Sequence, residues 1–453
     1  MVIARTAVAL LLLACGGSTP GKDRGNTPDT ASSATPTPVT PGLAGLRSQL
    51  EAAGFVVQEG DLSFDAAADC CDWASCLHTN PAGRYGTYAL PAAEGEFRDD
   101  RAPDPEGRTV TWRLRADEAL LYLGPEPPGA RYTSFRTYLN DVADADGRAI
   151  YFGSLGDSLN QLMWEANGDG TLVVATTGHA GTLAAVQSAA TAAGWPITNV
   201  DPLPQDAITL GLDADADALR MTLRVHGIED VDAVDAWGES PDVHILRITP
   251  AAPEPTVDPL PAPPLREPVE HGIPDLSDGV AALRAAILAE HDGWATQEAA
   301  LNVSTPPADE VCWPGCNRDV SYASTPAVPL GPGERIVVYG VDAVSLGRAT
   351  YIALVLYGAT NSDAAGVFEP GFTPGTASAF IPDHPDVDAL YAWTFARDCT
   401  GVAHCTEVQT GCPGVDPFEL ASVMWRAYLD PDTASFPHPD DLGGRGAFRF
   451  SPP

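Results

Sequence analysis

The sequence predicts an α+β fold in which two related domains, each built on mixed α/β sheets, pack together and are linked by disulfides. Three observations support this prediction. Short segments rich in β-branched and aromatic residues alternate with a few helical segments. The same order of segments occurs on both sides of a proline-rich stretch at 250–275, and eight cysteines follow residue 41. The chain has 453 residues, 44% of them hydrophobic, so it can bury sizeable cores.

Eight short segments are typical of strands, because each is apolar and rich in β-branched or aromatic residues. They are 120–123, 134–139, 149–152, 172–175, 219–225, 244–248, 336–339 and 352–357. The alternation of these segments with helical ones favours mixed sheets over an all-β or an all-helical fold.

Two helices are predicted from the residues at their ends. The first covers 181–193 and is closed by Gly194. The second begins at Asp416, where Glu419 completes a capping box, and stops before Pro431.

Four segments before the proline-rich stretch resemble four segments after it, in the same order. The matched pairs are 42–47 with 279–284, Trp-x-x-Cys at 73–76 with the same motif at 313–316, 118–124 with 334–340, and Arg131, Tyr132 and Tyr138 with Arg348, Tyr351 and Tyr357. Chance similarity between helices rich in Ala and Leu is the alternative. Duplication predicts a first domain at 42–249, a linker at 250–275 and a second domain at 276–453.

The N-terminus has the features of a secretory signal. Arg5 is followed by the apolar stretch 7–13, which is too short to span a bilayer stably. The residues Leu12-Leu13-Ala14-Cys15 resemble the lipobox of bacterial lipoproteins. This resemblance implies that 1–15 holds the signal and the lipidation site, with a lipid on the thiol of Cys15. The alternative is a simple cleaved signal with a stray cysteine.

Residues 16–41 are mostly Gly, Pro, Ser and Thr, a composition that predicts a flexible tether. Gly16 after the cysteine is compatible with outer-membrane delivery under the sorting pattern known for such lipoproteins. We therefore expect a protein of the bacterial cell envelope that is held to the outer membrane by its lipid. The net charge of -36 repels phosphate backbones, so we expect no nucleic-acid partner. The ligand or envelope partner is not identified by the sequence.

Eight cysteines remain after Cys15, an even number in an exported chain, and we expect four disulfides. Three of them precede the proline-rich stretch and five follow it, so complete pairing requires a bridge between the halves. Zinc binding by Cys312 and Cys316 with His404 is the alternative, although the spacing fits no zinc pattern. The eight are Cys70, Cys71, Cys76, Cys312, Cys316, Cys399, Cys405 and Cys412.

The block Gly156-Asp157-Ser158-Leu159 after an apolar strand looks like the nucleophile block of the GDSL, or SGNH, hydrolase family. The resemblance implies ester hydrolysis by Ser158, which requires a base and an oxyanion hole. The Asp-x-x-His block that provides the base in that family is missing, which leaves His179 and His244 as the candidates. A turn that caps backbone amides is the structural alternative. We expect no catalysis, with a divergent GDSL-like serine ester hydrolase as the alternative.

Aspartates gather in three runs, which favours calcium because hard cations prefer carboxylates. The runs are Asp141, Asp144 and Asp146, then Asp213, Asp215 and Asp217, and then Asp230, Asp232 and Asp235. The middle run departs from an EF-hand, since Ala218 replaces the glycine and Arg224 stands at the twelfth position. Solvated acidic turns are the simpler interpretation. We expect no cofactor, with a calcium-stabilised adhesion or structural protein as a further alternative.

Arg131 and Tyr132 hold the positions in the first domain that Arg348 and Tyr351 hold in the second. An arginine beside aromatic faces can receive an anionic or sugar-like ligand in a cleft between domains. The alternative is that each arginine pairs with a carboxylate on its own surface. The sequence thus predicts a secreted, membrane-anchored lipoprotein with a binding or envelope-associated role.

Overall fold

The structure is a computed structural model, and its described residues belong to one compact unit. They are 42–65, 78–98, 103–144, 147–254, 258–307, 311–312, 315–360, 362, 364–368, 375–411, 414–417 and 419–453. No helix in these ranges has the length and apolar character needed to cross a membrane.

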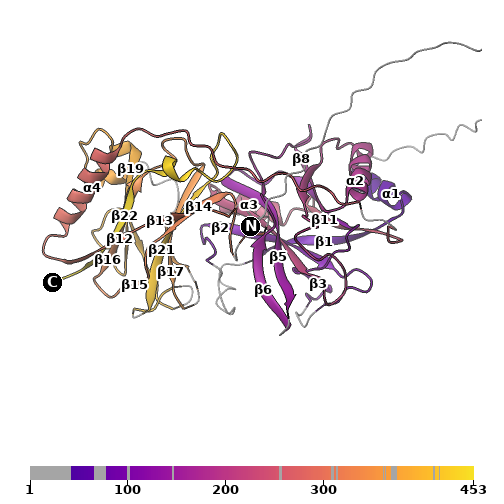
Figure 1. The fold of residues 1–453 in the computed structure, drawn as a ribbon, viewed down its shortest axis with the longest axis horizontal. Coiled ribbons are helices and arrows are strands. Elements are labelled where there is room, and N and C mark those ends of the chain that lie inside the picture. Colours follow the sequence, from indigo (N-terminus) through magenta and orange to yellow (C-terminus); the bar gives the residue numbers. More distant parts are fainter. Residues whose placement is uncertain are drawn as a thin grey trace, which may run out of the picture. The chain divides into compact units, whose positions relative to one another are not determined.

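The first half of the described chain contains three helices and eleven strands (Figure 1). They are α1 (Leu43–Ala52), β1 (Phe55–Asp65), β2 (Gly83–Pro91), β3 (Arg108–Thr109), β4 (Ala119–Pro125), β5 (Ala130–Asp144), β6 (Gly147–Ser154), β7 (Leu159–Asn160), β8 (Thr171–Thr177), α2 (Ala180–Ala193), β9 (Asn199–Pro202), β10 (Ala218–Ile228), α3 (Val231–Gly238) and β11 (His244–Pro250).

The second half contains one α-helix, eleven strands and short 3₁₀ turns. They are α4 (Ser277–Glu290), β12 (Ala295–Ala300), β13 (Asn302–Ser304), β14 (Val320–Ser324), β15 (Val328–Pro329), β16 (Arg335–Val341), β17 (Tyr351–Gly358), β18 (Ala364–Phe368), η2 (Thr376–Ala379), η3 (Val387–Ala389), β19 (Leu390–Ala396), β20 (Cys405–Glu407), β21 (Leu420–Tyr428), η4 (Pro439–Leu442) and β22 (Arg445–Ser451).

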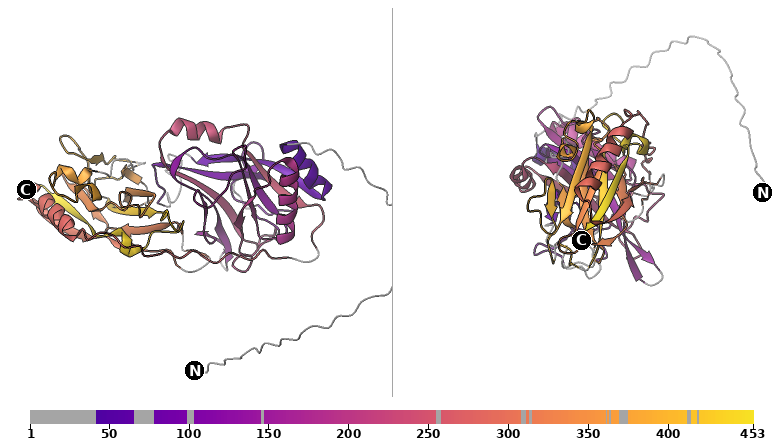
Figure 2. Two further views of the ribbon diagram at one scale, coloured as in Figure 1. Left: turned by 90° about the horizontal axis from the view of Figure 1, so that it is seen from above. Right: turned by 90° about the vertical axis from the view of Figure 1, so that its left-hand side faces the viewer.

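Each half consists of sheets with helices beside them (Figures 1 and 2). The two halves have the same sheet topology. In the first half one sheet segment runs β1-β11-β4-β8-β9 and the other runs β6-β5-β10-β2-β1, so β1 belongs to both. In the second half the corresponding sheets run β12-β22-β16-β19-β20 and β18-β17-β21-β14-β13. The β8–β9 and β19–β20 pairs are parallel, and the remaining pairs are antiparallel. The α+β fold with two related domains is therefore confirmed.

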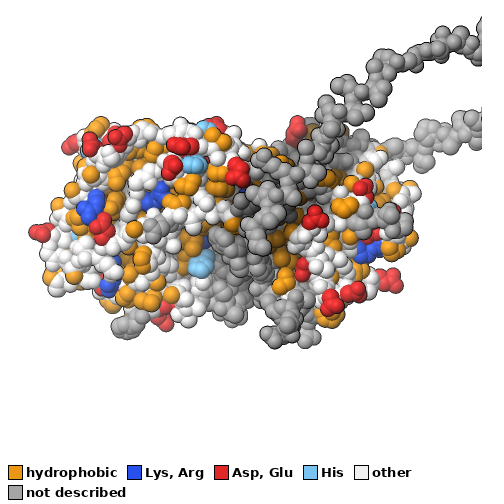
Figure 3. Space-filling view, in the orientation of Figure 1, with side chains coloured by type: hydrophobic (Ala, Val, Ile, Leu, Met, Phe, Trp, Pro, Cys, Tyr) orange, Lys and Arg blue, Asp and Glu red, His pale blue; other side chains and the backbone are white. Residues whose placement is uncertain are grey.

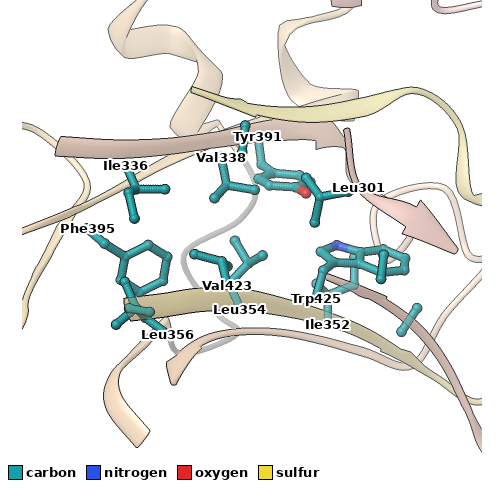
Figure 4. Packing of buried hydrophobic residues seen from close by; sticks show 14 of the residues in the cluster. Leu301, Ile336, Val338, Ile352, Leu354, Leu356, Tyr391, Phe395, Val423 and Trp425 are labelled. Atoms are coloured by element: carbon teal, nitrogen blue, oxygen red, sulfur yellow. The ribbon is translucent and has the colours of Figure 1, made fainter. Parts of the chain in front are cut away.

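Each half packs one sheet against the other around a hydrophobic core. Figure 4 shows this core in the second half, where side chains of β16 and β19 face side chains of β17 and β21. The labelled members include Ile336 and Val338 on one side and Leu354, Val423 and Trp425 on the other. Side chains alternate along each strand, so the next residues of β16 point to the outer face.

A helix covers the outer face of one sheet in each half, because that face is also apolar. Leu46 and Leu50 of α1 lie in a cluster with residues of β4 and β8. Leu283 and Ile287 of α4 lie in the corresponding cluster with residues of β16 and β22. The resemblance between 42–47 and 279–284 thus corresponds to helices in equivalent places. This helix-on-sheet layer explains why both segments carry an apolar stripe.

All eight predicted strand segments are strands in the structure, and the predicted helix at 181–193 is α2. The predicted helix from Asp416 is wrong, because Leu420–Tyr428 forms the central strand β21 between β14 and β17. Asp416 and Glu419 instead close a tight turn before the strand, with the Glu419 amide 3.0 Å from the Asp416 carbonyl. Pairing on both sides of β21 outweighs the local helix signals.

The proline-rich segment between β11 and α4 lies against both halves. Its amides find acceptors along the way: Ala251 donates to Gly54, and Leu260 donates to Gly178. Further on, Arg266 donates to Asp157 of the first half. Extended polyproline chain makes no internal hydrogen bonds, so its donors are satisfied by the surfaces that it crosses.

Two of the predicted disulfides are present, Cys312–Cys316 and Cys399–Cys405. These cysteines do not form the alternative zinc site, since both pairs are bonded as disulfides. Cys15 and the four other cysteines lie outside the described residues, as do Trp73 and Trp313 of the repeated motif. The predicted bridge between the halves stays a prediction.

We expect that bridge to link Cys412 to Cys70 or Cys71, with Cys76 paired to whichever of those two remains. The two disulfides above leave these four cysteines, and adjacent cysteines rarely bond to each other, because the geometry is strained. Non-reducing digestion followed by mass spectrometry should find the cross-linked peptides. Free thiols at all four positions would contradict the prediction.

Candidate functional site at the junction of the two halves

Two asparagines make reciprocal hydrogen bonds across the junction between the halves. The side chain of Asn80 donates to the Tyr351 hydroxyl over 3.0 Å, and the side chain of Asn317 donates to the Tyr132 hydroxyl over 2.7 Å. Both asparagines and both tyrosines are buried. The junction therefore has an internal two-fold pattern, in which equivalent residues of each half contact the other half.

Each asparagine is also fixed within its own half. The backbone amide of Asn80 donates to the Tyr85 hydroxyl over 2.8 Å, and that of Asn317 donates to the Tyr322 hydroxyl over 3.0 Å. The Asn80 side-chain oxygen accepts from the amide two residues later, and the Asn317 side-chain oxygen does the same. These groups are buried or partly buried and have hydrogen-bond partners, which holds both loops in one position.

Two arginines with equivalent positions lie buried beside these tyrosines. Arg224 donates to the Tyr138 hydroxyl over 2.6 Å, and Arg426 donates to the Tyr357 hydroxyl over 2.6 Å. The Arg224 guanidinium lies 4.8 Å from the centre of the Tyr138 ring, and that of Arg426 lies 5.3 Å from the Tyr357 ring. No carboxylate in the described ranges forms an ion pair with either one. Aromatic faces and hydroxyls therefore stabilise both cations.

Four rings meet at the centre of the junction. Tyr132 lies 4.7 Å from Tyr428 between ring centres, and Tyr351 lies 6.4 Å from His226. These are equivalent contacts, because the register places His226 opposite Tyr132 and Tyr428 opposite Tyr351. Gly83 lies against the His226 ring, and a Cβ there would come within 2.2 Å of it. The centre is thus closely packed.

Two histidines at the junction are held neutral. Burial, with Arg224 and Arg426 adding to it, lowers the pKa of His226 well below its ordinary value. Burial and then Arg426 lower the pKa of His78 to about 4. Both ring nitrogens of His226 lie buried without a hydrogen-bond partner in the described part of the chain. A protonated ring at this position is unfavourable because both neighbouring cations repel it.

Ser158 lies at one side of the junction and donates its hydroxyl to the carboxylate of Asp319. Tyr132 donates to the same carboxylate over 3.0 Å, and the Arg266 guanidinium lies 3.2 Å from it. Burial raises the pKa of Asp319, against the opposing effects of Arg266 and of the Ser158 hydroxyl. Groups from the first half and from the linker therefore meet at one carboxylate of the second half.

A second carboxylate extends this network. Asp157 pairs with Arg318 over 2.8 Å and accepts from the Arg266 amide. Next to it, the turn closed by the Cys312–Cys316 disulfide lies on β6, where the Cys312 amide donates to the Ser154 carbonyl over 3.0 Å. Asp157 and Ser158 are therefore part of the contact between the halves.

The structure separates the residues that were predicted to bind a ligand together. Tyr132 and Tyr351 lie fully buried at the junction. Arg131 is exposed, and Arg348 lies outside the junction, 3.9 Å from Asp432 and 3.3 Å from the Gly272 carbonyl. Neighbouring residues of a strand point to opposite faces, so Arg131 and Tyr132 do not share a side.

The structure places no histidine beside Ser158 that could act as the base of the hydrolase hypothesis. His179 caps α2 and accepts from the Thr182 amide, and His244 lies 3.2 Å from Glu59. All nine histidines lie in the described ranges, and none is hydrogen-bonded to Ser158. The Ser158 hydroxyl instead contacts a carboxylate that is buried with it.

Ligands for a metal ion gather at two places in the described part of the chain, and neither uses the three aspartate runs. The groups are His271, Asp430 and Asp432, and Glu270, His438 and Asp440. Asp230 caps α3, Asp235 pairs with Arg84, and Asp217 accepts the Thr209 amide. These aspartates thus have structural roles. Asp146 and the side chain of Asp144 lie outside the described residues.

Sequence reasoning missed Arg224, Arg426, His226 and Asp319. A signal for the arginines was available, because Arg224 precedes His226 by two residues, as Arg426 precedes Tyr428. Extending the comparison of the two halves into β10 and β21 pairs Arg224 with Arg426. No such signal exists for Asp319, whose equivalent in the first half is Ala82.

No family model matches the chain, and no curated protein matches it. Among solved structures, an uncharacterised protein from Burkholderia cenocepacia aligns over 87% of this chain and 81% of its own, with 11% identity and a TM-score of 0.40. The VPA0106 protein from Vibrio parahaemolyticus aligns over 83% of this chain and 90% of its own, with 10% identity and a TM-score of 0.36. At these values the likeness assigns no function.

We expect His226→Phe to flatten the loss of stability in acid. The unfolded state takes up a proton near pH 6.5 that folded His226 does not accept, so the contribution of His226 to the free energy of unfolding falls by about 1.4 kcal/mol per pH unit below that value. The variant lacks this contribution and should gain relative stability between pH 6.5 and 4.5. Urea unfolding at several pH values measures the difference. Tyr428→Phe, at the equivalent position, should leave the wild-type slope unchanged, and parallel profiles for His226→Phe and the wild type would refute the assignment.

Proposed function

We propose that this protein is a lipid-anchored protein of the bacterial envelope with a binding role and no catalytic activity. The strongest support comes from Ser158, the nucleophile of the alternative hypothesis. Its hydroxyl donates to Asp319, which also accepts from Tyr132 and pairs with Arg266. No imidazole contacts this serine among the described residues, and its carboxylate partner is already shared with Tyr132 and Arg266, so the histidine base of the GDSL-like mechanism is not in place.

Export to an oxidising compartment is supported by the two disulfides, because such bonds are rare in the reducing cytoplasm. Anchoring is supported by the lipobox-like residues that end at Cys15. Figure 3 shows acidic side chains spread over the visible face, with few basic ones. This surface favours cationic or neutral ligands over anionic ones.

A binding role is supported by the imidazoles and carboxylates that meet where the linker reaches the second half. The junction between the halves is a weaker candidate, because its tyrosines and asparagines already bond to one another. A ligand is therefore expected at the surface of the second half, away from the four central rings.

The full mature chain in detergent should not hydrolyse short acyl esters of p-nitrophenol. Ser158→Ala should be equally inactive but less stable by about 1–3 kcal/mol, because the buried Asp319 carboxylate loses a donor. Ester hydrolysis and urea unfolding of both proteins provide the comparison. Ser154→Ala, a nearby buried serine that donates to Gly156, is the matched control. Turnover that disappears only in Ser158→Ala would replace the proposal with a divergent serine hydrolase.

Expression in a diderm bacterium with an alkyne analogue of palmitate should label the wild-type chain. Cys15→Ser removes the thiol that would carry the lipid. It should therefore abolish the label and release the protein from the membrane fraction. In-gel fluorescence after click chemistry measures the label. An unlabelled wild-type chain would leave a simple cleaved signal in place of the lipoprotein.

A further inference from the structure

Two groups of metal-ligand side chains lie where the linker meets the loop between β21 and β22. His271, Asp430 and Asp432 form the first group, and Glu270, His438 and Asp440 form the second. In each group the donor atoms lie within 4.8 Å of one another. Glu270 and His271 are adjacent in the linker, and the other four residues belong to one loop.

The first group is held in place before any ion binds. His271 Nε2 lies 2.9 Å from Asp430 Oδ2, and the Asp432 amide donates to the other oxygen of Asp430 over 2.8 Å. Asp441 accepts from the amides of His271 and Gly272 over 2.8 and 2.6 Å, which fixes the linker backbone. Ligands with fixed positions lose little freedom when a metal ion binds.

Asp430 is the buried carboxylate of the first group. Its side chain is only 2% exposed, and in the described part of the chain its sole ion-pair partner is the His271 imidazole. One of its oxygens lies 2.9 Å from His271 Nε2 and the other accepts from the Asp432 amide, and a bound cation would balance the charge of the carboxylate. Asp432, with 63% of its side chain exposed, leaves the group open to solvent on one side. An ion can therefore enter and compensate the buried charge.

We propose that this cluster binds a divalent transition-metal ion of the Zn²⁺ type, with His271, Asp430 and Asp432 as ligands of the first position. Glu270, His438 and Asp440 form the second position. Imidazole with carboxylate suits Zn²⁺, whereas calcium prefers six to eight oxygen ligands. The inference names the ligand class for the binding role proposed above, but lipidation at Cys15 does not depend on it. A bound ion would fasten the linker to the second half.

Titration of the full mature chain in detergent with Zn²⁺ alone, followed by calorimetry, tests this site. We expect saturable binding and a melting temperature that rises with Zn²⁺ and returns when a chelator is added. His271→Ala and His438→Ala should each weaken binding by about tenfold or more, and the double variant should weaken it further. Ca²⁺ should bind more weakly than Zn²⁺.

His384→Ala is the matched control. The side chains of His384 and His271 are both 22% exposed, and His384 lies 3.8 Å from Asp386, outside both groups of metal-ligand side chains. Its Zn²⁺ affinity should equal that of the wild type. Asp432→Asn tests the site at an exposed position where loss of the fold is not expected, and it should also weaken binding. No heat and no melting shift with Zn²⁺, equal affinity in the double variant, or tighter binding of Ca²⁺ would each overturn the proposal. Loss of Zn²⁺ binding with normal palmitate labelling separates this failure from failure of the proposed anchor.

Discussion

The reciprocal hydrogen bonds of Asn80 and Asn317 are the constraint on which the arrangement of the two halves depends. Each asparagine bonds to a tyrosine of its own half, to a tyrosine of the other half and to its own loop. A small shift of one half would break both crossing bonds at once and leave three buried polar groups, the two asparagine side-chain amides and the Tyr351 hydroxyl, without these partners. Such groups cost more to leave unpaired than they contribute when paired, so the junction has one favourable register.

Because the two halves share one topology, equivalent residues of each half meet at the junction. At some of these equivalent positions the two halves carry different residues. Asp319 stands where the first half has Ala82, and Ser158 and Arg266 gather around Asp319 alone. His226 stands where the second half has Tyr428. The symmetric contacts of Asn, Tyr and Arg therefore provide the scaffold, while the asymmetric side adds an ionic contact that includes the linker. That contact uses the serine of the GDSL-like block, so Ser158 has a structural role at the junction.

Strands and helices with a local apolar pattern could be predicted from the sequence, but the junction could not. The segments 118–124 and 334–340 are apolar on both faces, since one face meets the other sheet and one meets a helix, so they appear as strands in isolation. Strand β21 was misjudged because its end signals are local, whereas its two ladder partners are distant in sequence. Arg224 and Arg426 escaped notice because a polar residue at every second position normally marks the solvent face of a strand. These faces are buried only because the two halves pack against each other there.

The linker is the element whose role the sequence described least well. Its prolines predicted an extended segment between two domains, and it is extended, but its amide donors are used by both halves. Ala251 and Leu260 bond to the first half, Arg266 bonds to both, and His271 bonds to Asp441 of the second. Each of these contacts shortens the length of chain that is free to change the distance between the halves. The His271 imidazole also lies 2.9 Å from the buried carboxylate of Asp430, whose only ion-pair partner among the described residues is this imidazole. The hydrogen bonds of the linker already hold it against both halves. A metal ion bound at His271 and Asp430 would add one more contact of this kind. The ion and the junction should therefore stabilise the same relative position of the two halves.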